Sequence, residues 1–284
     1  MINARGRRLV LGERTMIMGV VNLTPDSFSG DGRLSRSVQN PSRHCDYALQ
    51  LIHEGADIID VGGESTRPHA AVVSVIEEIR RVVPAITLLR KRSKAFISVD
   101  TSKIEVARLA LDAGADIVNN VMGMRASKEF LKIIRGSGAA FVLMHMRGTP
   151  RMMHLRTRYK SLIPEMLDEL SISLEKCLDS GIKSDKIIID PGIGFAKTAQ
   201  QNLLILRELK KFQYLKRPIL IGTSRKSFIG KIINEQVGDR SWGTAATVAA
   251  AIINGAHIIR VHDVKEMKQV AAVTDAVLNP TKVI

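Results

Sequence analysis

A short phrase recurs along this sequence and sets its architecture. It reads GADII at Gly55, GADIV at Gly114 and GAHII at Gly255, with a looser version, GAAFV, at Gly138. Each glycine closes a segment with helical spacing, and each phrase then opens a short run of strand-forming residues. The repeat therefore marks junctions at which a helix ends and a strand begins.

Eight apolar runs of strand length, each bounded by turn residues, are spread along the chain. They are residues 16–22 (MIMGVVN), 57–63 (DIIDVGG), 95–100 (AFISVD), 116–121 (DIVNNV), 139–146 (AAFVLMHM), 186–192 (KIIIDPG), 218–224 (PILIGTS) and 257–263 (HIIRVHD). Segments with helical spacing lie between them, among them 72–92, 104–113, 159–178 and 244–253. Strands that are apolar on both faces and alternate with helices indicate a parallel sheet covered by helices.

The length of the chain favours one closed barrel over an open sheet. Eight strand and helix repeats in 284 residues fit a (β/α)8 TIM barrel, for which about 250 residues is typical. No Gly-rich dinucleotide fingerprint follows the first apolar run, and no Pro/Gly/Ser-rich linker divides the chain. We predict a single barrel domain over residues 16–284, preceded by a short cap or hairpin over residues 1–15.

The composition narrows the partners and the location. The formal charge is +14, but Lys and Arg are scattered and aromatic residues, 4% of the chain, are not interleaved with them. This favours a solvated basic surface that also steers anionic substrates over one that binds nucleic acid. The absence of an apolar run near the roughly 20 residues of a membrane span predicts a cytoplasmic protein that does not contact membranes. Cys45 and Cys177 have no CxxC context, so we expect reduced structural thiols.

Polar side chains gather where the predicted strands end, and the carboxyl ends of the strands are where barrels of this kind carry their chemistry. One polar residue at such a place is usually a loop cap, but their concentration at one rim indicates a site. They are Asn22, Asp60, Glu64, Thr66, Asp100, Asn119, Asn120, His145, Asp190, Lys226, Arg260 and His262. For His145, which stands between two methionines, lining the pocket and packing behind it both stay open.

Two features of this rim indicate the substrate. Asp100 and Asp190 come from the third and sixth predicted strands, and buried carboxylates need donors such as an amino-substituted heterocycle or the nearby Lys226. Arg260 and His262 are two residues apart on one strand, so they face the same side and suit a phosphate group. The rim is therefore expected to bind a substrate that is both anionic and rich in nitrogen.

Seven phrases at the strand ends resemble those of the dihydropteroate synthase family. In order they are NLTPDSFSGDG from Asn22, DVGGESTRP from Asp60, SVDTSK from Ser98, LMHMRGTP from Leu143, DPGIGF from Asp190, TSRKSFIG from Thr223 and RVHDV from Arg260. The resemblance runs from Met16 to Val264. It implies a transferase of folate biosynthesis that condenses a dihydropterin-methyl diphosphate with 4-aminobenzoate to give dihydropteroate and pyrophosphate. It also implies Mg2+ as the cofactor, a homodimer, and a target for sulfonamides.

The resemblance further implies a role for each residue that matches a family motif. Asn22 is expected to meet the metal and the diphosphate, with Thr66, Arg260, Val261 and His262 as further diphosphate contacts. The pterin pocket is expected to be lined by Asp100, Asn119, Asp190 and Lys226. The residues expected around 4-aminobenzoate are Phe28, Arg67, Pro68 and Ser227. Catalysis is expected to depend on Asp100, Lys226, Arg260 and His262.

Elementary chemistry agrees with these roles. The amino-oxo edge of a pterin presents N–H donors that Asp190 together with Asn119 can complement, and Lys226 can donate to a ring acceptor. Departure of the diphosphate leaves a stabilised pterin-methyl cation, so we hypothesise a dissociative substitution in which electrostatics supplies most of the catalysis. A helix beginning after Thr223 is expected to turn its N-terminus toward the aminobenzoate carboxylate.

Three other functions are compatible with parts of this sequence. A methyltetrahydrofolate-dependent methyltransferase shares a pterin-binding barrel, although it has no need of the TSRKS phrase or the Arg260 and His262 pair. A Schiff-base aldolase could use Lys226, provided that its pKa is lowered. A basic nucleic-acid-binding protein is the alternative outside enzymes. For Arg225, beside Lys226, a structural ion pair is expected.

Overall fold

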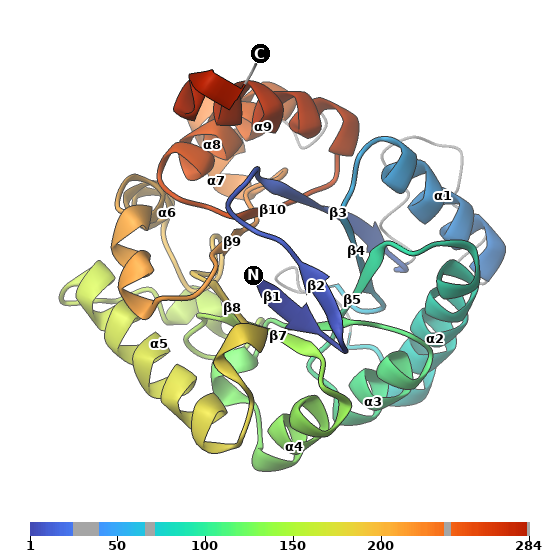
Figure 1. Ribbon diagram of the computed structural model, residues 1–284. Helices are drawn as coiled ribbons and strands as arrows, with labels where there is room; N and C mark the ends of the chain where they lie inside the picture. Colours follow the sequence, from blue (N-terminus) through green and yellow to red (C-terminus); the bar gives the residue numbers. More distant parts are fainter. Residues whose placement is uncertain (25–39, 66–71, 236–239, 283–284) are drawn as a thin grey trace.

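The computed structural model describes residues 1–24, 40–65, 72–235 and 240–282. Within these residues a ring of parallel strands surrounds a common axis (Figure 1). The strands are β3 (Met16–Asn22), β4 (Ile58–Gly62), β5 (Phe96–Asp100), β6 (Ile117–Asn120), β7 (Ala140–Met144), β8 (Ile187–Asp190), β9 (Leu220–Ile221) and β10 (Ile258–Val261). They are hydrogen-bonded in the order β8-β7-β6-β5-β4-β3-β10-β9, and a parallel bridge between Ile189 and Ile219 joins the two ends. The predicted (β/α)8 TIM barrel is confirmed.

Each predicted apolar run contains one of these strands. The run at residues 16–22 is β3 from end to end, whereas the run at 218–224 holds only the two residues of β9. Pro218 has no N–H for a ladder, which limits the pairing at the start of that run. Its carbonyl still accepts a hydrogen bond from Ile189 of β8, at 2.9 Å.

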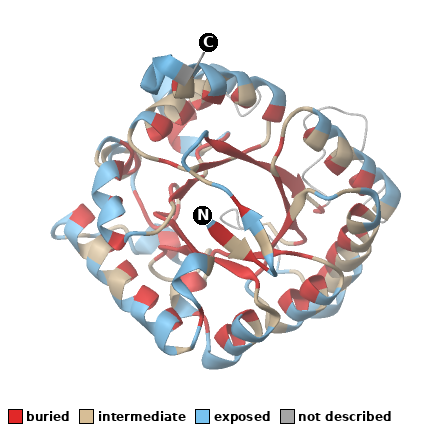
Figure 2. Ribbon diagram, viewed as in Figure 1, coloured by how far each residue is buried: buried red, intermediate tan, exposed pale blue. Residues whose placement is uncertain are grey.

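Helices surround the strands and cover their outer faces (Figure 1). Those of the described residues are α1 (Pro41–His53), α2 (Val75–Arg92), α3 (Ile104–Asp112), α4 (Lys128–Ser137), α5 (Leu162–Asp179), α6 (Ala199–Arg207), α7 (Ser227–Ile233), α8 (Ser241–Ile253) and α9 (Val264–Leu278). Short 3-10 helices are η2 (Gly123–Arg125), η3 (Met153–Leu155), η4 (Ser184–Lys186), η5 (Leu209–Leu215) and η7 (Pro280–Lys282). The buried side of each helix faces the barrel and the exposed side faces outward (Figure 2). None of the helices described is both long and apolar enough to cross a membrane.

The repeated glycine phrase is a repeated helix end. Gly55, Gly114 and Gly255 have φ of +110°, +114° and +97°, a conformation that other residues adopt only with strain. Each donates to the carbonyl three residues before it, and the following alanine donates to the carbonyl five residues before itself. This pair of bonds satisfies carbonyls that the end of a helix leaves open, and it turns the chain into the next strand.

The end of the barrel that receives the amino ends of the strands is closed by a hairpin. β1 (Ile2–Ala4) and β2 (Arg7–Leu9) pair in antiparallel fashion and lie across this end (Figure 1). Ile2 and Leu9 pack in one cluster with side chains from inside the barrel, such as Ile58. The domain boundary placed before residue 16 stays a prediction.

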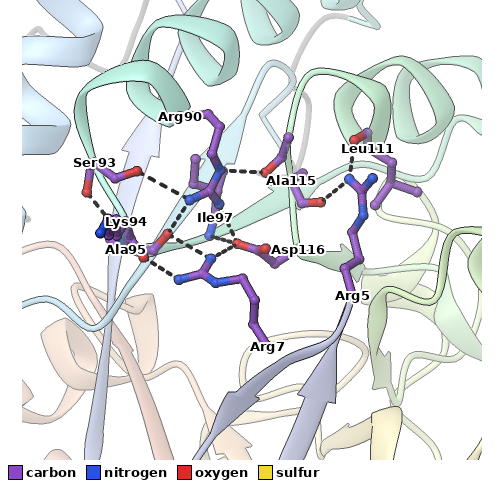
Figure 3. A network of polar contacts seen from close by, with 11 residues as sticks. Arg5, Arg7, Arg90, Ser93, Lys94, Ala95, Ile97, Leu111, Ala115 and Asp116 are labelled. Atoms are coloured by element: carbon purple, nitrogen blue, oxygen red, sulfur yellow. Dashed lines mark hydrogen bonds and ion pairs between the residues drawn. The ribbon is translucent and has the colours of Figure 1, made fainter.

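Arginine side chains fix this hairpin to the barrel (Figure 3). Arg7 and Arg90 both donate to the buried carboxylate of Asp116, Arg7 at 2.8 Å. Arg5 donates to the carbonyls of Leu111 and Ala115, near the end of α3. Arg5 and Arg7, both near the start of the sequence, are therefore engaged in the fold.

Candidate active site at the carboxyl end of the barrel

The strand register gathers the predicted residues at the opposite end of the barrel, the carboxyl end. Asn22 of β3 lies beside Gly62 of β4, Gly62 beside Asp100 of β5, and Asp100 beside Asn119 of β6. Four neighbouring strands therefore end in one row. The glycine in this row leaves room, and the Asn22 amide oxygen and the Asp100 side chain lie on either side of it.

Arg260 of β10 reaches across the barrel and holds two carboxylates. Its Nε donates to Asp60 Oδ2 at 2.6 Å, and its Nη2 donates to Asp100 Oδ2 at 2.9 Å. The Asn119 amide also donates to Asp60 Oδ2, at 3.0 Å. From the sequence we expected a heterocycle or Lys226 to donate to Asp100. In this structure Arg260 is the donor.

Asp60 is the buried centre of this cluster. Its side chain is fully buried, and among the described residues its Oδ1 has no hydrogen-bond partner. A buried acceptor without a partner is costly, so this oxygen has capacity for a further donor. Asp60 was named in the sequence among the polar strand ends but received no role. The sequence did contain a signal for such a role, because Asp60 is a carboxylate inside a strand that is otherwise apolar.

The carboxylates at this end of the barrel have perturbed pKa values. Burial raises the pKa of Asp100 to about 7, although the neighbouring Arg260 opposes the rise. Burial also raises the pKa of Asp190, whose Oδ1 accepts a hydrogen bond from the Gly192 N–H at 2.7 Å. Raised carboxyl pKa values that are caused by burial among specific charged neighbours are typical of functional sites.

Lys226 lies over the aromatic ring of Phe195, which belongs to the segment between β8 and α6. Its Nζ is 4.2 Å from the ring centroid, a distance that allows a cation–π contact. Burial and the charge of Arg260 lower the pKa of Lys226 to about 8, while Asp190 and Asp100 oppose the change. Lys226 is therefore a half-buried cation near both predicted pterin carboxylates. Phe195 is a contact that the sequence interpretation did not identify.

Three of the remaining predicted residues belong to the described part of the chain: His262, Val261 and Ser227. His262 Nδ1 is 3.0 Å from the Ser224 hydroxyl, and Val261 is buried in β10 beside it. Ser227 is the first residue of α7 and is exposed. Phe28, Thr66, Arg67 and Pro68 lie outside the described residues. Hydrogen bonds join Asp100, Asn119 and Arg260 through Asp60, whereas none within the described part of the chain joins Ser227 to them.

Arg225 forms the structural ion pair expected of it. Its guanidinium bonds to both carboxylate oxygens of Asp263, with Nε at 3.2 Å from Oδ2. The residue is in a left-handed conformation, with φ of +58°, and its N–H donates to the Thr244 hydroxyl at 3.2 Å. Arg225 therefore links the start of α7 to the start of α9.

Comparison with known proteins identifies related enzymes. The sequence model of the family described as pterin binding enzyme matches residues 18–262. A dihydropteroate synthase from Synechocystis sp. is 46% identical over 266 residues, which cover 93% of this chain and 91% of that protein. The structure is similar to a Yersinia pestis dihydropteroate synthase in complex with a sulfonamide drug, with a TM-score of 0.91, 36% identity, and coverage of 98% and 99% of the two chains. It is also similar to a Xanthomonas albilineans dihydropteroate synthase with 4-aminobenzoic acid, with a TM-score of 0.89, 36% identity and 98% coverage of both chains.

Proposed function

The chain belongs to the dihydropteroate synthase family of pterin-binding enzymes, and from this we propose how its barrel performs the family reaction. The enzyme joins (7,8-dihydropterin-6-yl)methyl diphosphate to 4-aminobenzoate and releases pyrophosphate, a step of folate biosynthesis. The observation that carries the proposal is the cluster of Asp60, Asp100, Asn119 and Arg260, which is assembled from four strands at the carboxyl end of the barrel.

The reaction exchanges one bond for another at the pterin methylene carbon. The C–O bond to the diphosphate breaks, and its electron pair leaves with pyrophosphate. The amine nitrogen of 4-aminobenzoate forms the new C–N bond and then releases one proton to water. An aryl amine is neutral near pH 7, so no activating base is required. Stabilisation of the separating charges accounts for most of the rate.

Arg260 can bind the departing diphosphate and keep its hydrogen bonds to Asp60 and Asp100 at the same time. A guanidinium has five N–H donors, of which two are used on Asp60 and Asp100. The rest can hold phosphate oxygens by charge-assisted hydrogen bonds. His262, two residues along the same strand, adds a second donor. Asp100, ionised, favours positive charge on the ring as the bond breaks.

The pterin ring is held by the other residues of the cluster. Asp190 accepts from the N–H donors of the amino-oxo edge, and Asn119 completes that edge. Lys226 donates to a ring acceptor from its position over Phe195. The 4-aminobenzoate contacts proposed for Phe28, Arg67 and Pro68 lie outside the described residues. The bound 4-aminobenzoic acid of the Xanthomonas albilineans relative supports the choice of this substrate.

Mg2+ is proposed as an ion that accompanies the diphosphate. Among the described residues, no group of three or more His, Cys, Asp or Glu side chains could hold a metal alone. Asn22 offers a neutral amide oxygen, and Mg2+ commonly combines such a ligand with substrate phosphates and water. The donor set therefore fits a metal that is shared with substrate. When bound, Mg2+ would neutralise charge on the leaving group.

Measurement of pyrophosphate tests the function. The purified protein with both substrates and Mg2+ is expected to release pyrophosphate, and release without 4-aminobenzoate would support the dissociative step. Arg260→Met is expected to lower kcat/KM by about a hundredfold or more, whereas Arg225→Met, which removes an arginine outside the cluster, is expected to stay within about twofold. Absence of release by the unaltered protein would refute the proposal.

The alternatives considered from the sequence receive less support. The relatives described above are synthases, which favours this reaction over methyl transfer from methyltetrahydrofolate. The lowered pKa of Lys226 meets one requirement of a Schiff-base enzyme, but the carboxylates near it oppose the neutral amine. Trapping with borohydride and a carbonyl substrate would distinguish a Schiff-base enzyme from the synthase. Nucleic-acid binding predicts a steep salt dependence of binding to random DNA.

A homodimer is the proposed assembly. Large apolar side chains are exposed on α8 and α9, where Trp242 is 87% exposed, Val273 66% and Val277 70%. Covering such side chains with a second copy removes apolar surface from water.

Sedimentation equilibrium is expected to give twice the 31.2 kDa of one chain. Trp242→Glu is expected to lower that mass, whereas Tyr214→Glu, at an exposed residue of η5, is not. A wild-type protein of single-chain mass would contradict the proposal. The cytoplasmic location stays a prediction.

A further inference from the structure

Lys197, in the segment between β8 and α6, is a buried cation that the proposed chemistry does not use. Only 9% of its surface is exposed. Its Nζ lies 2.9 Å from the Phe195 carbonyl, 3.1 Å from His145 Nδ1 and 3.4 Å from the His145 carbonyl. An ammonium group has three donors, and these acceptors match them in number. Burial nevertheless lowers the pKa of Lys197 to about 7, so the amino group is held there at a cost.

His145 transmits this contact to α5. Because an ammonium group can only donate, His145 Nδ1 is the acceptor and Nε2 carries the ring proton. Nε2 lies 3.1 Å from Glu169 Oε2. Burial lowers the pKa of His145 to about 4, which keeps the ring neutral. The open choice for His145 is thus resolved: its side chain is fully buried behind the site.

Arg147 and Tyr159 connect Glu169 to Ala196, the residue before Lys197, so the contacts form a closed loop. Arg147 Nε donates to Glu169 at 2.8 Å, and the guanidinium lies over the Tyr159 ring, 3.9 Å from the centroid. The Tyr159 hydroxyl donates to the carbonyl of Ala196, the residue before Lys197, at 3.3 Å. We call the closed set of Lys197, His145, Glu169, Arg147 and Tyr159 the Lys197 ring.

The Lys197 ring contacts the segment 191–196, which contains strained or crowded backbone positions. Gly192, Gly194 and Ala196 have φ of +71°, +81° and +52°, and the last of these is uncommon for a residue with a side chain. A Cβ on Gly192 would come within 2.1 Å of the His145 carbonyl oxygen, so this segment and the end of β7 are in close contact. Such a conformation persists only where surrounding contacts determine it.

The same segment carries the surface that Lys226 needs. Phe195 presents its ring to Lys226 Nζ, and Gly194 lies against the Lys226 side chain. Asp190, at the start of the segment, accepts the His145 N–H on its carbonyl at 2.8 Å. A shift of this segment would therefore move Phe195 and Lys226 together.

We propose that Lys197 is a positioning residue of the pterin subsite: its bonds to Phe195 and His145 hold the segment 191–196 so that Phe195 and Lys226 stay in place for the pterin ring. This inference rests on the proposed function, because it assigns a role within the same site. Lys197 touches no substrate in this scheme. It acts through Phe195, and the 4-aminobenzoate subsite does not depend on it.

The test compares two lysines that both donate to backbone carbonyls. Lys197→Met removes the ammonium group and keeps an apolar side chain of similar length. Lys186→Met is the matched control, since Lys186 donates to the Gly138 and Asn3 carbonyls at the far end of the barrel. For Lys197→Met we expect the KM for the dihydropterin-methyl diphosphate to rise by about tenfold or more, because small displacements in a site have large effects. The KM for 4-aminobenzoate is expected to change less than about twofold, and Lys186→Met is expected to leave both KM values unchanged.

Two further measurements keep the inference falsifiable. If Lys197→Met does not fold, Tyr159→Phe removes only the hydroxyl bond to Ala196 and is expected to raise the same KM by a smaller factor. Titration with 6-hydroxymethylpterin measures pterin affinity without turnover. An active Lys197→Met enzyme with both KM values near those of the wild type would overturn the inference, as would an equal shift in Lys186→Met. A wild-type protein that binds the pterin but releases no pyrophosphate would refute the proposed function alone, and the titration would still decide the role of Lys197.

Discussion

At the scale of single residues, the site depends on how its charges balance. Asp60, Asp100 and Asp190 face Lys226 and Arg260, and Asp190 also lies near Lys197, so three potential anions compete for partly shared cations before substrate enters. Arg260 reduces the imbalance by bonding to two of the carboxylates at once. The raised pKa values of Asp100 and Asp190 are the expected response of buried carboxyl groups that are not fully compensated.

This balance predicts a narrow pH optimum. Asp100 titrates at about 7 among Arg260, Asp60, Glu78 and Lys226. As the pH falls below that value Asp100 gains a proton and can no longer favour positive charge on the pterin, so kcat/KM is expected to fall. Lys226, facing Arg260, Asp190 and Asp100, loses its proton above about 8, so kcat/KM is expected to fall there too. The pH profile of kcat/KM is therefore expected to be bell-shaped.

Two variants assign the limbs of that profile. Lys226→Arg keeps a cation that does not titrate, so the part of the basic limb that Lys226 causes is expected to move above the range measured, whereas a part caused by Lys197, whose pKa is about 7, is expected to remain. Asp100→Asn is expected to remove the acid limb from whatever activity is left. A basic limb that stays near pH 8 in Lys226→Arg would show that another group causes it.

At the scale of elements, the sequence was informative because most strand residues are buried on both faces of the sheet and several helices are followed by a glycine with positive φ. The apolar run at residues 16–22 and the phrase at Gly55 each correspond to a local constraint, and local constraints can be read from local sequence. The Lys197 ring could not be read in this way. Lys197 is 52 residues from His145, and His145 is 24 from Glu169, so only the closed barrel brings them together. The link between Asp60 and Arg260, 200 residues apart, was hidden for the same reason.

Glycines at two kinds of position are expected to respond in opposite ways to alanine. Gly55 ends α1 with φ of +110°, and an added Cβ would lie 3.2 Å from the Lys268 side chain. Gly55→Ala is therefore expected to lower the free energy of unfolding by about 1–2 kcal/mol. Gly136 is exposed within α4, and an added Cβ would meet nothing within 4 Å. Gly136→Ala is expected to raise the free energy of unfolding by about 0.5–1 kcal/mol. Urea denaturation measures both, and equal signs would contradict this account of the junctions.

At the scale of the whole molecule, the two ends of the barrel do different work. The carboxyl end holds Asp100, Asp190 and Lys226, whose pKa values are shifted, whereas the other end holds the hairpin, the Asp116 ion pairs and Lys186. Such a division lets the stability of one end be altered without loss of the chemistry at the other. It also shows why the net charge alone says little about binding partners, since Arg5, Arg7 and Arg90 form contacts within the fold.

The hairpin provides a test of that division. Leu9 is 4% exposed and packs against the cluster that fills the barrel at this end, while its neighbour Val10 is 43% exposed. Leu9→Ala is expected to lower the free energy of unfolding by about 2–4 kcal/mol, because it removes buried methyl groups and leaves a cavity. Val10→Ala is expected to change the free energy of unfolding by less than about 0.5 kcal/mol. Both KM values are expected to stay at those of the wild type under conditions where the variant is folded. A Leu9→Ala enzyme that is folded but has a raised KM for the pterin substrate would show that the two ends are coupled through the strands.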